Sequence, residues 1–214
     1  MTVLRPWQRS AARGLAIAVL GCLLVGCISL LPKQKPAQLY RFGVSAAPSA
    51  PHAAGPGRFS VQAVPMGFAR DAASDTILTV TGDQAAYIAG SRWVTSASSL
   101  FEAAVTRAFD ADGGPARLIP HGEAVRPDYA LKLDVRRFEA RYDAGQQSPP
   151  TVVVELYAGL VRRAGDGATA PAERIFQASV PASENRAGAI AAAFDSAVTK
   201  VLGEMVVWVD AKGA

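Results

Sequence analysis

The chain has 214 residues and half of them are hydrophobic, which is enough for one domain with its own core. Its formal charge is +4, but three of the 22 basic residues (Arg5, Arg9 and Arg13) lie in the first 26 residues, where there is no acidic residue. The rest of the chain has 19 basic and 18 acidic residues, a net charge of +1. A near-neutral body without a Lys/Arg cluster excludes a nucleic-acid-binding protein.

Cysteine and histidine are scarce. Cys22 and Cys27, the two cysteines, both fall at the end of the first apolar run, so the body has neither a disulfide nor a thiol nucleophile. His52 and His121 are the two histidines. This composition provides no ligand set for zinc or haem, and we expect no cofactor.

The N-terminus has the pattern of an export signal. Three arginines precede the uncharged stretch of residues 14–26, GLAIAVLGCLLVG, as a charged n-region precedes an h-region. The stretch closes on Leu24-Val25-Gly26-Cys27, which resembles the lipobox of bacterial lipoproteins. We therefore predict a signal peptide over residues 1–26 and lipidation of Cys27. Because Ile28 follows and not an aspartate, the pattern favours the outer membrane over the inner membrane.

Three alternatives to this assignment remain open. Val19-Leu20-Gly21-Cys22 is a second candidate for the lipidation motif, with an apolar run of only about eight residues before it. The 18 uncharged residues 14–31 are just long enough for an uncleaved membrane helix. A buried core helix is the third interpretation.

Short strands are expected in the first part of the body. Residues 39–42 alternate in polarity, whereas residues 46–57, AAPSAPHAAGPG, contain three prolines and are typical of a linker. A strand pattern resumes at 58–64. Residues 77–80 and 85–89, on either side of Gly82-Asp83, predict a hairpin.

A helix is expected next. Ser99 with Glu102 three positions later has the capping-box pattern, and Gly113-Gly114 would end the helix. Large and small apolar residues recur between them at helical spacing: Phe101, Val105, Ala108 and Phe109.

The second half is richer in strands. Residues 129–138 alternate, with a phase break at Arg136-Arg137 that predicts a β-bulge. Strands are also expected at 151–161 and 174–180, and a long helix over 190–208. This order predicts an α/β (α+β) fold: a single domain with a mixed sheet and two main helices packed on it. We expect domain boundaries at residues 27–57 for the lipidated N-terminus, short strand and linker, and 58–210 for the folded domain.

Few residues are candidates for chemistry or recognition. His121 beside Glu123, and Gly165-Asp166-Gly167, are more typical of surface loops than of a catalytic base or a phosphate-binding loop. Arg92-Trp93 follows a strand and precedes the helix. Either the indole covers the sheet edge while the arginine is solvated, or the pair is partly exposed and contributes to a partner interface.

Several motifs together resemble the ABC-type transport auxiliary lipoprotein family, the PqiC-like group that accompanies MCE-domain (MlaD-like) lipid transporters. The motifs are the lipobox, Tyr87 with Arg92-Trp93, Asp128-Tyr129-Ala130-Leu131, Arg137-Phe138, Val154-Glu155, Arg174 to Pro181 (RIFQASVP), Ala192-Ala193-Phe194-Asp195 and Trp208. Apart from the lipobox, the match covers essentially the whole mature chain, from Leu39 to Trp208.

This resemblance implies a periplasmic domain with a three-layer arrangement like that of anticodon-binding or TolB N-terminal domains. It also implies an MCE-domain protein, an ABC permease and an ATPase as partners, with a possible homo-oligomer, and it supplies no catalytic residue. The main hypothesis is therefore a non-catalytic docking subunit of a lipid transporter, held to the membrane by its lipid. The alternatives are a free-standing lipoprotein that binds lipid or peptidoglycan, and a periplasmic hydrolase.

Overall fold

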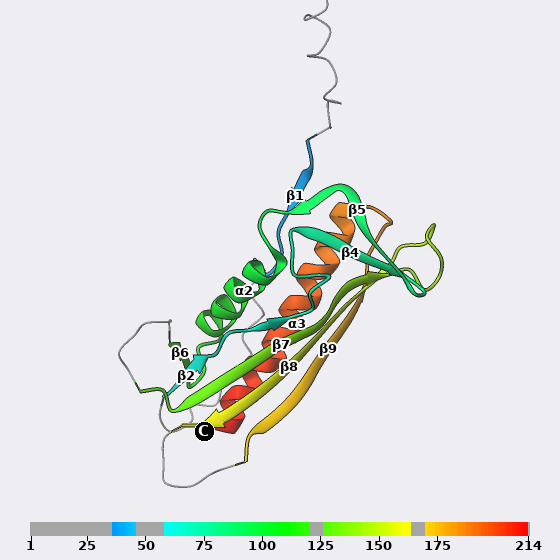
Figure 1. Cartoon of the computed structure of the whole chain (residues 1–214). Coiled ribbons are helices and arrows are strands. Elements are labelled where there is room, and N and C mark those ends of the chain that lie inside the picture. Colours follow the sequence, from blue (N-terminus) through cyan, green and yellow to red (C-terminus); the bar gives the residue numbers. More distant parts are fainter. Residues whose placement is uncertain (1–35, 46–57, 120–125, 164–169, 214) are drawn as a thin grey trace, which may run out of the picture. The chain divides into compact units, whose positions relative to one another are not determined.

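The computed structural model describes residues 36–45, 58–119, 126–163 and 170–213. These residues form nine strands, which in chain order are β1 (Gln38–Tyr40), β2 (Phe59–Ala63), β3 (Gly67–Phe68), β4 (Thr76–Thr81), β5 (Gln84–Trp93), β6 (Ala116–Ile119), β7 (Tyr129–Arg141), β8 (Thr151–Arg162) and β9 (Ala172–Pro181). The helices within these ranges are α2 (Ala97–Asp112), between β5 and β6, and α3 (Ala187–Gly213), which follows β9 (Figure 1).

Strand β7 is the centre of one sheet. Along one edge it pairs antiparallel with β8 over nearly its full length, and β8 pairs antiparallel with β9. Along its other edge three short strands follow one another in parallel: β2 at Tyr129–Leu131, β3 at Asp134–Val135 and β4 at Ala140–Arg141. Strand β6 then pairs with β2, β5 with β4, and β1 with β5. The sheet is mixed, as predicted.

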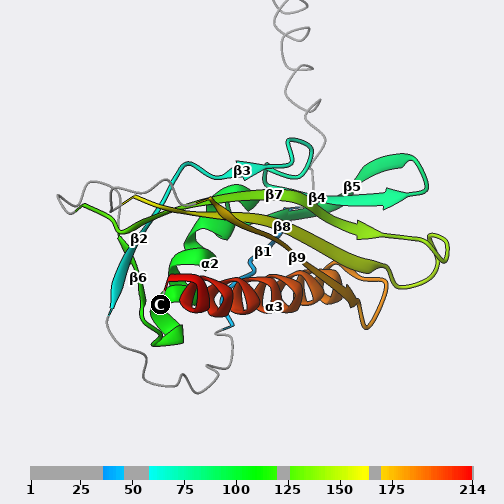
Figure 2. The same ribbon diagram turned by 90° about the horizontal axis from the view of Figure 1, so that it is seen from below.

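Both helices lie on the same face of the sheet (Figure 2). The ring of Phe138 on β7 is 6.3 Å from Phe101 of α2 and 4.6 Å from Phe194 of α3, measured between ring centroids. One core therefore lies between one helical layer and one sheet. The single α+β domain with two helices is confirmed, but the expected third layer is not found among the described residues, because the two helices cover one face together.

Strand β7 shows how the sequence directs one face inward. From Leu131 its buried residues alternate with polar ones as far as Val135, where the register with β8 shifts by one residue before Arg137. The shift leaves Arg136 as the extra residue of a β-bulge, as predicted, and it returns Phe138 to the buried face. Without this extra residue, Phe138 and Ala140 would point to the polar face.

Helix α2 begins earlier than the capping-box pattern indicated. Ser96 is the N-cap, and its side-chain oxygen accepts a hydrogen bond from the Ser99 amide at 3.2 Å. The amides of Ala97 and Ser98 donate to the carbonyl oxygens of Ser74 and Ala73, so a neighbouring segment satisfies the first turn. The predicted end is confirmed, because Gly113 has φ = 69° in the left-handed region that suits a C-cap glycine.

Helix α3 buries the stripe predicted from the sequence, from Ile190 to Trp208, and continues to Gly213. No helix among the described ranges is both long enough and apolar enough to cross a membrane.

The first strands of the body differ in extent from their sequence patterns. The short strand expected at residues 39–42 is present as β1, and because it pairs with β5 it belongs to the compact unit Ala37–Ala214. The hairpin of β4 and β5 is confirmed, but β5 continues to Trp93. Gly90, with φ = 66°, lies in the irregular stretch where β5 has more residues than β4 between their paired positions. Arg92 and Trp93 are therefore the last two residues of a strand, not part of the connection after it.

Candidate functional site

The predicted lipidation site lies outside the described residues, and so do His121 and Gly165-Asp166-Gly167. Lipidation of Cys27 stays a prediction. Of the residues singled out for recognition, Arg92 and Trp93 are described.

Trp93 lies in the core. Its side chain is 1% exposed, and its ring contacts Phe42 at 4.9 Å and Phe194 at 5.3 Å between centroids, both in edge-to-face geometry. Phe138 lies 6.2 Å away. The expectation that the Arg92-Trp93 pair is partly exposed is thus wrong for the indole. The β1 segment, β7 and α3 each supply one ring around it, which the local sequence does not indicate.

Arg92 points the other way and is half exposed. Its Nη1 atom is 3.0 Å from both carboxylate oxygens of Asp75, and the Trp93 amide donates to the Asp75 carbonyl oxygen at 2.7 Å. Side chain and backbone of Asp75 together therefore hold the start of β4 to the end of β5. Sequence reasoning did not identify Asp75 as the partner of Arg92.

Asp128, in one of the family motifs, joins β2 to the start of β7. Its Oδ2 atom accepts hydrogen bonds from the amide and the hydroxyl of Ser60, both at 2.7 Å, and the Asp128 amide donates to Ser60 Oγ at 3.0 Å. These bonds, that of the Ser60 side chain above all, lower the pKa of the Asp128 carboxyl below its usual value.

Asp195, in another of these motifs, fixes the chain that follows β1. From α3 it accepts hydrogen bonds from the Val44 amide at 3.1 Å and the Ser45 hydroxyl at 2.6 Å. Like Asp128, it bonds to backbone that is distant in sequence. Both carboxylates therefore have structural roles.

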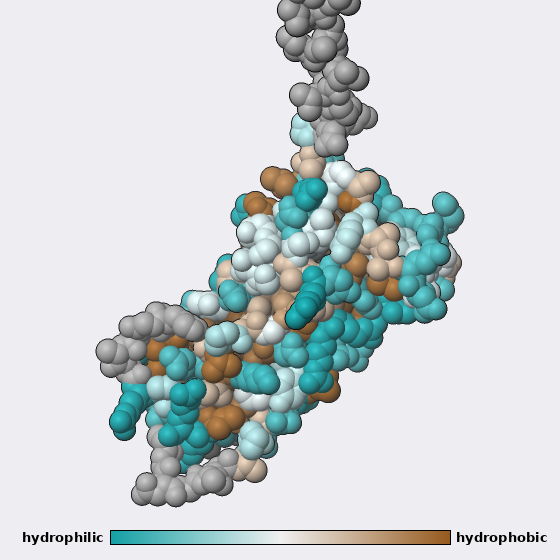
Figure 3. Space-filling model, in the orientation of Figure 1, coloured by the Kyte–Doolittle hydropathy of each residue, from teal (hydrophilic) through white to brown (hydrophobic). Residues whose placement is uncertain are grey.

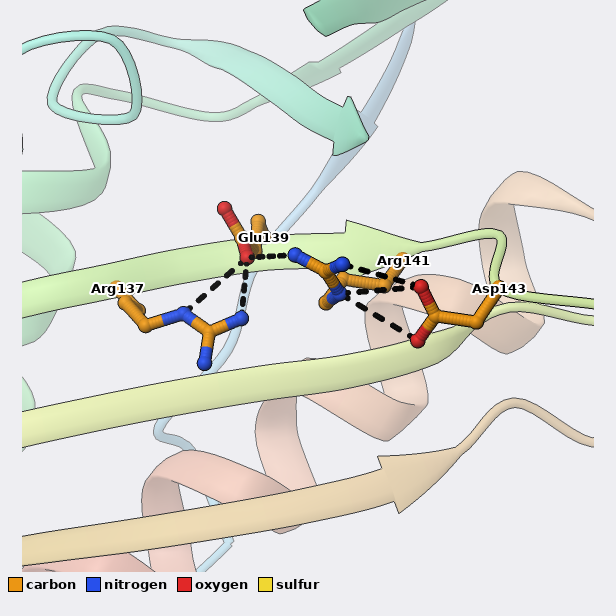
Figure 4. Close-up of polar contacts among 4 residues, drawn as sticks. All are labelled: Arg137, Glu139, Arg141 and Asp143. Carbon is orange, nitrogen blue, oxygen red and sulfur yellow. Dashed lines mark hydrogen bonds and ion pairs between the residues drawn. The ribbon is translucent and has the colours of Figure 1, made fainter. Parts of the chain in front are cut away.

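The face of β7 that points away from the helices carries a row of alternating charges (Figure 4). Glu139 accepts hydrogen bonds from Arg137 at 2.7 Å and from Arg141 at 3.3 Å, and Arg141 also reaches Asp143 at 3.1 Å. Asp143 and Glu139 raise the pKa of the Arg141 guanidinium. Each charge has an opposite neighbour, and the central Glu139 side chain is only 14% exposed, so this row is a partly buried ion-pair network that needs no external ligand.

Two open hollows flank α2. One, of about 300 Å³, lies between α2, α3 and the Gly43–Ser45 segment; the other, of about 590 Å³, lies between α2, β6 and residues 63–66. Both have largely apolar walls. Within the described part of the chain, no group of three or more His, Cys, Asp or Glu side chains is placed to hold a metal ion.

Fold and polar contacts together define a two-layer α+β domain whose motif residues mostly build its core or tie its segments together. Comparison with known proteins identifies the family. Residues 40–206 match the model of the ABC-type transport auxiliary lipoprotein component, and the chain belongs to this family. The resemblance inferred from the sequence is confirmed, and with it a place in the Gram-negative cell envelope as a lipid-anchored protein.

Two solved structures have a similar fold. Protein XCC0632 from Xanthomonas campestris is 30% identical, with a TM-score of 0.68 over 83% of this chain and 97% of that chain. The hypothetical protein CT253 from Chlamydia trachomatis is 13% identical, with a TM-score of 0.50 over 74% of this chain and 99% of that chain, which is a likeness of fold alone. The search of curated proteins found no match.

Proposed function

We propose that the protein is a non-catalytic docking subunit of an MCE-linked lipid transporter, anchored in the outer membrane through Cys27. Its partners would be an MCE-domain protein, an ABC permease and an ATPase. The observation that carries this proposal is the extent of the family match, which runs from the end of β1 into the last turns of α3. The match thus includes the sheet and both helices.

The roles of the motif residues support a scaffold. Trp93 and Phe194 are in the core, and Asp128 and Asp195 hold backbone segments. These contacts explain the presence of all four residues in the motifs without a catalytic role, because the two rings pack in the core and the two carboxylates bond to backbone amides. We therefore place the function in the surface of the domain and not in a reaction centre.

A binding function is the second candidate, and the hollow of about 590 Å³ beside α2 is the observation that favours it. Its walls include Val64, Met66 and Leu118, and apolar walls suit an acyl chain. The hollow is open to solvent, whereas a lipoprotein that stores lipid by itself needs an enclosed cavity.

Co-purification tests the proposal. The full lipidated chain, tagged at its C-terminus, is extracted from membranes in mild detergent and the proteins that accompany it are identified. We expect an MCE-domain protein with its permease and ATPase, all absent when an unrelated tagged lipoprotein is extracted in the same way. Recovery of the chain alone, with lipid bound to it, would instead favour the binding function.

A further inference from the structure

The outer face of the β1–β5 strand pair has an unusual composition. Leu39 is paired with Arg92, and Tyr40 with Trp93. Side chains alternate along a strand, and Trp93 points into the core, so Arg92 and Val94 point outward. Leu39 of β1 and Arg41, which follows β1, point outward beside them. We call Leu39, Arg41, Arg92 and Val94 the β1 face.

Two of these four residues are large apolar side chains left in water. Leu39 is 62% exposed and Val94 is 45% exposed. The Val94 amide donates to the Tyr40 carbonyl oxygen at 2.8 Å, which places Val94 beside β1. Figure 3 shows hydrophobic residues on the surface at the end of the domain where β1 lies. Apolar groups grouped with arginines are typical of surfaces that meet a lipid headgroup layer.

The length of chain before β1 limits what this face can reach. Ten residues lie between Cys27 and Gln38, which are therefore eleven residue steps apart. Because a chain extends by at most about 3.6 Å per step, the two residues are at most roughly 40 Å apart. Lys33 and Lys35 lie in this stretch and are attracted to anionic lipids. If Cys27 carries the lipid, as in the proposed function, β1 stays within roughly 40 Å of the bilayer and can reach it.

We propose that the β1 face rests on the membrane in which the protein is anchored. Leu39 and Val94 enter the headgroup region, and the guanidinium of Arg41 binds lipid phosphates. Arg92 stays paired with Asp75 and holds β5 in position. Two apolar side chains bind a membrane weakly by themselves, but the tether makes their contact intramolecular and so raises its effective concentration.

A protein partner on the same face is the competing occupant, and the sequence alone suggested it. That hypothesis depended on an exposed indole beside Arg92, because tryptophan and arginine are typical anchors of protein interfaces. Trp93 is buried, which leaves leucine, valine and arginine close to the point of attachment. These observations favour the bilayer.

The test uses the full chain, processed and lipidated, in vesicles of phosphatidylethanolamine and phosphatidylglycerol. Cleavage of the signal peptide removes Cys22, and the lipid occupies the thiol of Cys27, so the mature chain has no free thiol. A single introduced cysteine can therefore be labelled with an environment-sensitive fluorophore. Leu39→Cys and Val94→Cys probe the β1 face. Val161→Cys on β8 and Val207→Cys on α3 are matched controls, since these valines are 41% and 45% exposed.

Lipids that carry a nitroxide quench only fluorophores that touch them. We expect the labels at 39 and 94 to lose most of their fluorescence and shift to the blue, while those at 161 and 207 stay unchanged. If the protein floats with the vesicles but all four labels stay equally bright, the proposed membrane contact is wrong and the lipid anchor is still supported. If the fluorescence of the labels at 39 and 94 changes when partner proteins are added but not when nitroxide lipids are present, the β1 face binds a protein and not the bilayer. Protein that does not float would overturn the anchor and the contact together.

Discussion

Trp93 and Arg92 are adjacent in the chain, and their environments predict opposite results of substitution. Trp93→Ala removes a ring that contacts Phe42 and Phe194, so we expect the free energy of unfolding to fall by about 3–5 kcal/mol. Arg92→Ala removes a pair whose side chains are 50% and 44% exposed, which costs at most about 1 kcal/mol. Urea unfolding of the two variants checks both values.

The same Arg92 variant tests the partner contact predicted from the sequence. Arg186→Ala is a matched control, since Arg186 also forms an exposed ion pair, with Glu184 at 2.6 Å. If Arg92→Ala alone weakens co-purification of the MCE-domain protein, Arg92 contributes to that interface. If Arg92→Ala and Arg186→Ala behave alike, the partner binds elsewhere.

Asp128 makes stability depend on pH in acid. Its folded pKa is lowered, chiefly by the Ser60 hydroxyl, so its contribution is fully present above the unfolded value near 3.8 and is lost as pH falls through the lower folded value. Ser60→Ala removes the hydroxyl donor and should cost about 1 kcal/mol at neutral pH. It should also reduce the loss of stability below pH 3.8. Thermal melts across this range measure both effects, and parallel pH profiles for the two proteins would contradict the assignment.

Helix α2 offers a test at the scale of a secondary-structure element. Ser96→Ala removes the N-cap acceptor and should lower the free energy of unfolding by about 1 kcal/mol. Ser99→Ala is the comparison, because alanine keeps the backbone amide that donates to Ser96 and removes only the hydroxyl that accepts from Ser96 at 2.7 Å. A larger loss with Ser99→Ala would mean that the helix begins where the capping-box pattern placed it.

The cap illustrates why element boundaries were harder to predict than the elements. Local pattern was sufficient for the stop at Gly113, the bulge at Arg136 and the long stripe of α3, because each depends on neighbours in the chain. The start of α2 depends on Ser74 and Ala73, which accept from its first amides. Strands β3 and β6 were missed, since two and four residues carry too little periodicity and their partners are distant in sequence.

The candidate site could be predicted only in part for the same reason: local patterns were readable, whereas contacts between residues distant in sequence were not. The motifs identified the family, but the burial of Trp93 depends on rings at positions 42, 138 and 194. The ion pair of Arg92 depends on how β4 approaches β5. Neither follows from residues adjacent in the chain.

At the scale of the whole molecule, attachment to the membrane is the property to test first. We expect Cys27→Ser to leave unprocessed and unlipidated precursor, because the thiol that receives the lipid is missing. Cys22→Ser should be processed normally. Gel mobility and incorporation of labelled palmitate distinguish the two. Equal processing of both single variants would contradict lipidation at Cys27.

The three short strands along one edge of β7 have a consequence for how the chain folds. Strands β2, β3 and β4 come from the first half of the sequence, but each completes its hydrogen bonding only on β7, up to about 70 residues later. Such high contact order slows folding, because loop-closure entropy is lost before the strands gain their pairing. A nascent or exported chain therefore stays largely unfolded until β7 has emerged, and a fragment that ends before Tyr129 lacks a stable sheet.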